Sequence, residues 1–74
     1  MTKRRITYRR NHPEAEVETG VICQVAYSYQ GKEMTWCVVP DDGRAIAAIV
    51  WWDEVIEIEG ATNLTIVKPS TNPV

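Results

Sequence analysis

The feature that most constrains the fold is an apolar run at residues 45–52, Ala-Ile-Ala-Ala-Ile-Val-Trp-Trp, eight consecutive residues without a polar side chain. A strand covered on one face alternates apolar and polar residues, so an unbroken run predicts a strand covered on both faces. A helix over residues 45–59, ended by Gly60, is the alternative. We favour the strand because the segment is rich in β-branched residues, which lose side-chain freedom in a helix. Its glutamates would also lie toward the negative end of the helix dipole.

A regular alternation over residues 21–30 predicts another strand. Val, Cys, Val, Tyr and Tyr alternate there with Ile, Gln, Ala, Ser and Gln, which is the period of two typical of a strand. Gln30 and Gly31 then predict a two-residue hairpin turn, because glycine readily adopts positive φ. The register that follows puts the apolar residues of both strands on one face. Its pairs are Tyr29 with Lys32, Tyr27 with Met34, Val25 with Trp36, and Cys23 with Val38.

The rest of the chain predicts short strands joined by turns. Pro40 and Gly43 suit the corners of a turn at residues 39–44. Residues 52–55 predict a tight corner or one turn of 3₁₀ helix, residues 56–59 a short strand with an acidic outer face, and residues 64–67 a last strand. Residues 5–9 alternate as an edge strand would, and His12-Pro13 ends that segment. Residues 69–74 are a polar tail with nothing to pack.

Three of these features occur together in a known architecture. They are a glycine-containing hairpin, an Asp41-Asp42-Gly43 turn, and a strand that leads through Trp52-Asp53-Glu54-Val55 into Ile56-Glu57-Ile58. Over residues 16–59 this layout resembles a small Src-homology-3-like barrel. Members of that group that bind proline-rich peptides carry an aromatic, acid-rich first loop. This chain has no counterpart of that loop, so the resemblance implies no peptide-binding residues here, and the fold by itself hosts unrelated functions.

We therefore expect an all-β protein, a small five-stranded and partly open antiparallel barrel. The expected organisation is a basic N-terminal arm at residues 1–13, the β-barrel domain at residues 14–68, and a disordered tail at residues 69–74. Seventy-four residues are close to the lower limit for a self-supporting core. The chain has no apolar segment long enough to span a bilayer and no secretory signal, so a soluble cytoplasmic protein without membrane contact is expected.

Charge is distributed unevenly along the chain. Residues 1–12 carry five of the eight basic residues and no acid, whereas the remainder carries three basic and all ten acidic residues. Such asymmetry is typical of a basic arm or interaction tail, although a solvated end and an arm folded onto the acidic body are also open. Basic residues interleaved with an aromatic suit phosphate contacts and base stacking. The nucleic-acid alternative rests on Lys3, Arg4, Arg5, Tyr8, Arg9 and Arg10.

Enzymatic chemistry finds little support in the sequence. The two cysteines, Cys23 and Cys37, point to opposite faces in the expected register, which disfavours a disulfide, and we expect a small core residue and a half-buried one. With the sole histidine, His12, they cannot complete a four-ligand structural zinc site from one chain. The carboxylate pairs at residues 41–42 and 53–54 suit turns better than metal binding. We expect no enzyme, no cofactor and no metal.

The three tryptophans carry the main functional hypothesis. Adjacent residues of a strand point to opposite faces, so Trp51 and Trp52 cannot both face one core. The outward one lies against the arm, the last strand or a partner, and tryptophan is enriched at the centres of protein interfaces. We expect a protein-binding or adaptor module that uses Trp36, Trp51 and Trp52. Because a small chain has few layers to cover such a strand, a homodimer through the outer face of residues 45–52 is also expected.

Overall fold

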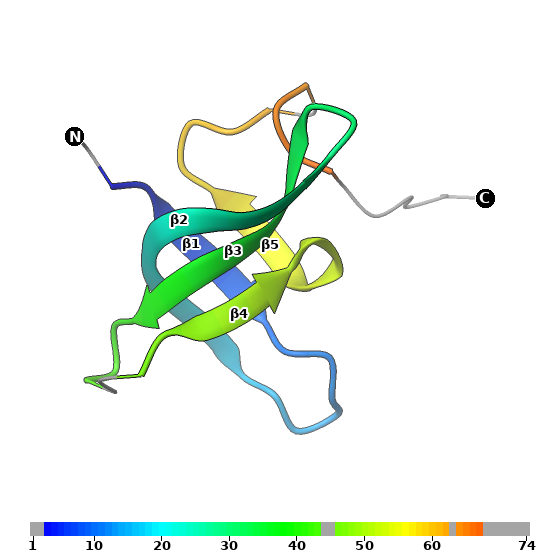
Figure 1. Cartoon of the computed structure of the whole chain (residues 1–74). Coiled ribbons are helices and arrows are strands. Elements are labelled where there is room, and N and C mark those ends of the chain that lie inside the picture. The colour runs from blue at the N-terminus through cyan, green and yellow to red at the C-terminus, as the bar shows by residue number, and fades with distance from the viewer. Residues whose placement is uncertain (1–2, 44–45, 63, 68–74) are drawn as a thin grey trace.

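The computed structural model describes residues 3–43, 46–62 and 64–67, and confirms the all-β class. Its elements are β1 (Arg5–Arg9), β2 (Val17–Tyr29), β3 (Lys32–Pro40), β4 (Ala48–Trp51), a 3₁₀ turn (Trp52–Glu54) and β5 (Val55–Ile58). The five strands form one antiparallel sheet in the order β4-β3-β2-β1-β5 (Figure 1). β4 and β5 are its edges, and in the described part of the chain no strand pairing joins them, so the sheet is not closed into a barrel.

The core lies on the concave face of this curled sheet and receives side chains from all five strands. Trp36, Val38 and Val50 are completely buried, and Tyr8 is only 1% exposed. The buried hydrophobic set is Ile6, Tyr8, Ile22, Trp36, Val38, Val50, Ile58 and Ile66. Burial of a large side chain contributes about 1.5–3 kcal/mol, so the sheet is stabilised mainly by this one cluster.

Residues Arg5–Arg9 of the N-terminal segment form a strand of the sheet, as their alternation predicted, although they were also assigned to a basic arm outside the barrel domain. β1 lies between β2 and β5 in the strand order, where an edge position was expected. Arg5 and Arg9 point to solvent, whereas Ile6 and Tyr8 between them are buried. The alternation of residues 5–9 was therefore a strand signal, and two large apolar side chains hold the strand in the core. Residues 1 and 2 of the expected arm lie outside the described residues.

The β2–β3 hairpin confirms the predicted turn and about half of the predicted register. Gln30 and Gly31 have φ angles of 50° and 79°, as a tight hairpin turn requires. Tyr29 pairs with Lys32 and Val25 with Trp36 as expected. In contrast, Val38 pairs with Ile22 and Thr35 pairs with Tyr27, because the register shifts at three places along the hairpin. These β-bulges insert unpaired residues at positions 23 and 26 of β2 and 34 of β3.

The bulge at position 23 changes which side chains face the core. Beyond it, Ile22 is buried, whereas Cys23 is exposed. The expectation that Cys23 is a core residue is therefore wrong, and Cys37 is half-buried as expected. Both cysteines are free.

The apolar run forms a strand over only half its length. β4 covers Ala48–Trp51, and the 3₁₀ turn begins at Trp52, which confirms the predicted strand and corner and excludes the long helix. Val50 is completely buried, whereas Ile49 and Trp51 are 40% and 49% exposed. The strand is thus covered on one face only by the described residues, and cover on both faces is not observed. Residue 45 and its neighbour Arg44 lie outside the described residues.

The predicted last strand is replaced by a single bridge. Ile66 makes one parallel bridge with Glu33, and its side chain is 4% exposed. The Glu33 N–H donates to the Thr65 carbonyl (2.9 Å), and the Val67 N–H donates to the Glu33 carbonyl (2.8 Å). Figure 1 shows this segment, in orange, beside the tip of the β2–β3 hairpin. The fifth strand of the sheet is therefore β1, and the expected tail at residues 69–74 lies outside the described residues.

We expect replacement of Gly20 by alanine to destabilise the protein. A Cβ at this buried position would lie 2.6 Å from Val38 Cγ1 and 2.7 Å from the Val39 carbonyl oxygen. Overpacking of this kind costs about 1–3 kcal/mol. Chemical denaturation measures the effect. Gly60→Ala is the comparison that reports backbone strain alone, because Gly60 has positive φ but no atom within 4 Å of its Cβ position. Equal stability of Gly20→Ala and the wild type would contradict the close approach of β2 and β3.

Candidate protein-binding surface

The face of the sheet opposite the core presents an apolar surface over β2, β3 and β4, which we call the outer face. Residues that are paired across antiparallel strands share a face, so the register assigns its members. Thr35 pairs with both Trp51 and Tyr27, and Cys37 pairs with both Ile49 and Gln24. Both rows lie opposite the core, because the neighbouring row through Trp36 is buried. The outer face is formed by Tyr27, Thr35, Cys37, Val39, Ile49 and Trp51.

Large apolar side chains on this face remain open to solvent. Tyr27 is 58% exposed, Trp51 49%, Ile49 40% and Val39 38%. Tyr29, two residues beyond Tyr27 on β2, adds a further ring at 53% exposure. Single exposed apolar residues are ordinary on a protein surface, whereas a contiguous group of this kind marks an interaction site.

Thr35 lies between the two aromatic residues of the first row and is only 3% exposed. Its hydroxyl has no hydrogen-bond partner, the one such buried side-chain atom found in the described part of the chain. An unsatisfied buried hydroxyl costs about 1–3 kcal/mol, and such atoms are uncommon in native structures. Trp51 and Tyr27 therefore flank a buried hydroxyl whose hydrogen-bonding capacity is unused.

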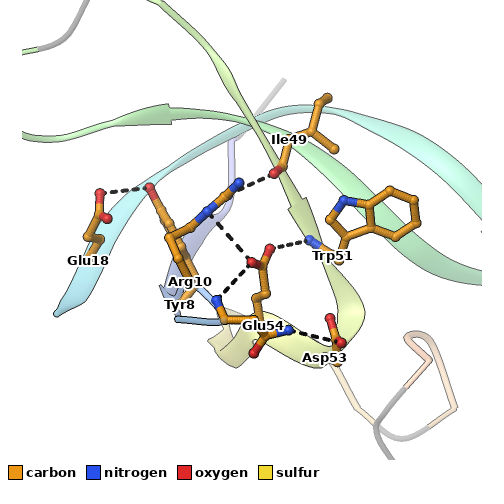
Figure 2. A network of polar contacts seen from close by, with 8 residues as sticks. Tyr8, Arg10, Glu18, Ile49, Trp51, Asp53 and Glu54 are labelled. Carbon is orange, nitrogen blue, oxygen red and sulfur yellow. Dashed lines mark hydrogen bonds and ion pairs between the residues drawn. The ribbon is translucent and has the colours of Figure 1, made fainter. Parts of the chain in front are cut away.

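A polar network holds the strand that carries Trp51 (Figure 2). The Glu54 carboxylate, on a residue only 8% exposed, accepts the backbone N–H of Trp51 (3.1 Å) and that of Asn11 (3.2 Å). Arg10 Nε lies 3.6 Å from the same carboxylate, and Arg10 Nη1 donates to the Ile49 carbonyl at 2.8 Å. The network joins the end of β1 to the edge of β4, where no strand pairing exists, and so it fixes the backbone on both sides of Val50.

The remaining basic residues of the N-terminal segment also contact the body of the protein. Arg4 Nη2 donates to Glu33 Oε1 at 2.7 Å, and Trp36 Nε1 donates to the same oxygen at 2.9 Å. Arg9 Nε donates to the Ala15 carbonyl at 2.9 Å. Lys3 is exposed. Arg5 donates to Asp41, so four of the five basic residues expected to contact phosphates have partners within the chain.

Tyr8, expected to stack on bases, is buried and donates its hydroxyl to Glu18 Oε1 at 3.3 Å. The segment therefore offers no exposed aromatic ring among the residues proposed for nucleic-acid binding.

Arg5, the first residue of β1, forms an ion pair with Asp41, which directly follows β3. The hydrogen bond from the Arg5 guanidinium lowers the pKa of the Asp41 carboxyl, and a second hydrogen bond from the Thr19 hydroxyl (2.6 Å) acts in the same direction. The same contact raises the pKa of Arg5. Both groups are exposed, so water and salt screen the pair, and it contributes little to stability.

An acidic groove lies beside this ion pair. Its volume is about 710 Å³, and it runs between the loop after β1 and the turn after β3. Glu14, Glu16, Glu18, Asp41 and Asp42 line it together with His12. Among the residues that the structure describes, no group of three or more histidine, cysteine or carboxylate side chains is arranged to hold a metal ion.

The structure separates the three tryptophans proposed for binding. Trp36 is a core residue with 0% exposure, Trp52 is half-buried against the core, and Trp51 alone is on the outer face. Tyr27 and Thr35 belong to this surface but were missed by sequence reasoning, because the bulges pair Tyr27 with Thr35 in place of the expected Met34. Ile49 lies within residues 45–52, whose outer face was expected to form an interface.

Comparisons with known proteins add no identification, because no family model, no curated protein and no solved structure matches the chain. Within the described residues, no helix is long and apolar enough to cross a membrane.

Proposed function

We propose that this protein is a non-enzymatic protein-binding module and that the outer face is its binding surface. The observation that carries the proposal is the half-exposed indole of Trp51 on a strand whose backbone is fixed by Glu54 and Arg10. A side chain held on a rigid element loses little conformational entropy on binding. At the centre of a protein interface, a few aromatic side chains typically supply most of the binding energy, and the apolar contacts around them contribute little.

The proposed partner is another protein that presents apolar side chains to Trp51 and Tyr27, because both rings are about half exposed on the outer face. The strand order, with one short turn between β4 and β5, supports the Src-homology-3-like assignment. We place the protein in the cytoplasm, where reducing conditions suit a chain whose two cysteines are free and one of them exposed.

Replacement of Trp51 by alanine is expected to weaken binding while the fold is kept. Peptides selected from a displayed random library on the wild-type protein serve as the probe, and titration calorimetry measures their affinity. Loss of a central aromatic anchor corresponds to about 2 kcal/mol or more, or roughly a thirtyfold rise in Kd. Ile56→Ala is the matched control, because Ile56 is 55% exposed on β5, away from the outer face.

Amide chemical shifts locate the bound peptide independently of the variants. We expect shifts at the outer-face positions of β2, β3 and β4 and none on β5. Peptides that bind Trp51→Ala as tightly as the wild type, or that shift only residues of the acidic groove, would refute the outer face as the binding surface.

A further inference from the structure

The second half of β2 has an edge that no described strand covers. β1 pairs with β2 from Val17 to Val21, and among the described residues the Ile22 N–H, which donates to the Arg4 carbonyl (2.9 Å), makes the last backbone hydrogen bond on that side. Beyond it, every described strand pairing of β2 is with β3. The segment from Cys23 to Tyr29 therefore presents one side to solvent among the described residues. A row of open backbone groups of this kind is a template for another strand.

The contacts of Glu33 show which backbone groups face this edge. Its N–H and carbonyl are directed away from β2, toward Thr65 and Val67. Two residues that are directly paired in an antiparallel sheet either both direct their N–H and carbonyl groups toward each other or both direct them away. Because the groups of Glu33 point away from β2, its partner Ser28 forms a non-hydrogen-bonded pair with it. The N–H and carbonyl of Ser28 consequently point to the open edge, where the N–H can donate and the carbonyl can accept a hydrogen bond without disturbing the hairpin.

This edge lacks the charged side chains that lie at the edges of β4 and β5. No charged residue and no proline occurs from Gly20 to Gly31, although 24% of the whole chain is charged. The edge of β4 is closed by Arg10 and Glu54, and the other edge strand, β5, carries Glu57. Natural edge strands are usually blunted by charge, proline, β-bulges or a covering segment. Of these devices, the open part of β2 has among the described residues only its bulges at positions 23 and 26.

We propose that a second copy of this chain pairs with the open edge of β2, antiparallel and about a two-fold axis at Ser28. The axis brings Ser28 opposite the partner subunit's Ser28, so a charge at or beside the axis would lie close to the same charge of the other copy, and the edge has none. The two Ser28 residues exchange both backbone hydrogen bonds. Tyr27 then lies opposite the partner subunit's Tyr29, and Tyr29 lies opposite the partner subunit's Tyr27. The sequence Tyr-Ser-Tyr is thus symmetric about the axis.

This dimer goes beyond the proposed function and differs from the homodimer expected through residues 45–52. A two-fold axis perpendicular to the sheet keeps the outer faces of both copies on one side. The two apolar surfaces then form one continuous surface through the four tyrosines, and both Trp51 side chains remain open for a partner. Only a few residues pair on each side, so the dimer is weak and forms at high protein concentration.

Sedimentation equilibrium of the full chain, in reductant and over a wide range of protein concentration, tests the dimer. The wild type is expected to shift from monomer to dimer as concentration rises. Ser28→Pro removes the N–H that faces the edge and not one that faces β3, so it should stay folded and monomeric. Ser28→Lys places two ammonium groups on the axis and should raise the dimer Kd about tenfold or more.

Gln24→Lys is the matched control, because it adds the same charge to the same strand. The two-fold axis places residue 24 past the hairpin turn of the partner subunit, so the added charge lies outside the paired residues. Its dimer Kd should equal that of the wild type, and circular dichroism should show that all variants are folded. A wild type that remains monomeric throughout, or a dimer that both Ser28 variants retain, would overturn the proposal. A dimer lost in Trp51→Glu but kept in Ser28→Lys would assign the contact to the outer face instead. Neither result bears on peptide binding by the monomer.

Discussion

A chain that lacks residues 1–9 is expected to be unfolded. The deletion removes β1 from between β2 and β5, and β5 then has no neighbour in the sheet. It also removes Ile6 and Tyr8, each 1% exposed, from a core of eight buried hydrophobic residues. Loss of one large core side chain costs about 3–5 kcal/mol, and a domain of this size has little more stability than that. Far-ultraviolet circular dichroism during heating measures the effect.

Point variants of Tyr8 keep this prediction testable in the full chain. Tyr8→Ala should lower the free energy of unfolding by about 3–5 kcal/mol, as for other buried aromatic residues. Tyr8→Phe is the control, because it keeps the ring and removes only the hydroxyl that donates to Glu18, for which about 1 kcal/mol is expected. A truncated chain with a cooperative thermal transition would mean that β1 is dispensable and that the segment is an arm after all.

Replacement of Glu54 by alanine is expected to cause the second large loss of stability. The change leaves the backbone N–H groups of Trp51 and Asn11 without their acceptor and Arg10 without its carboxylate. Breaking a buried ion pair costs about 3–5 kcal/mol, but Arg10 is about one-third exposed, so about 2–3 kcal/mol is expected here. Chemical denaturation gives the value.

Two further variants separate the charge of Glu54 from its hydrogen bonds. Glu54→Gln keeps an oxygen that can accept the Trp51 N–H and should cost less than Glu54→Ala. Asp53→Asn is the control, because Asp53 is exposed and its hydrogen bond from the Asn11 side chain lies at the surface. We also expect Glu54→Ala to broaden the indole resonance of Trp51, since the backbone of that residue is no longer fixed. An alanine variant as stable as the wild type would show that the network does not hold β4 to the end of β1.

Local sequence patterns determined the elements of this protein. The alternation before Gln30-Gly31 specified a hairpin, and the structure has positive φ at both turn residues. The β-branched run specified a strand, and Trp52-Asp53-Glu54 specified a corner. These features depend on steric preferences of the backbone and on side-chain periodicity, which act over a few residues. For the same reason, the sequence showed that Trp51 and Trp52 could not share one face.

Only the tertiary structure decided how these elements are used. Residues 5–9 have the pattern of a strand, but their place between β2 and β5 depends on the packing of Ile6 and Tyr8 against side chains far away in the chain. The bulges at positions 23 and 26 reverse which residues face the core, because the curled sheet must bring Ile22 and Trp36 into one cluster. Trp51 became the exposed tryptophan because Val50, its neighbour, fills the core position opposite Trp36. Each of these choices is made by contacts between distant segments, and a pattern with a period of two carries no information about which distant segment a face will meet.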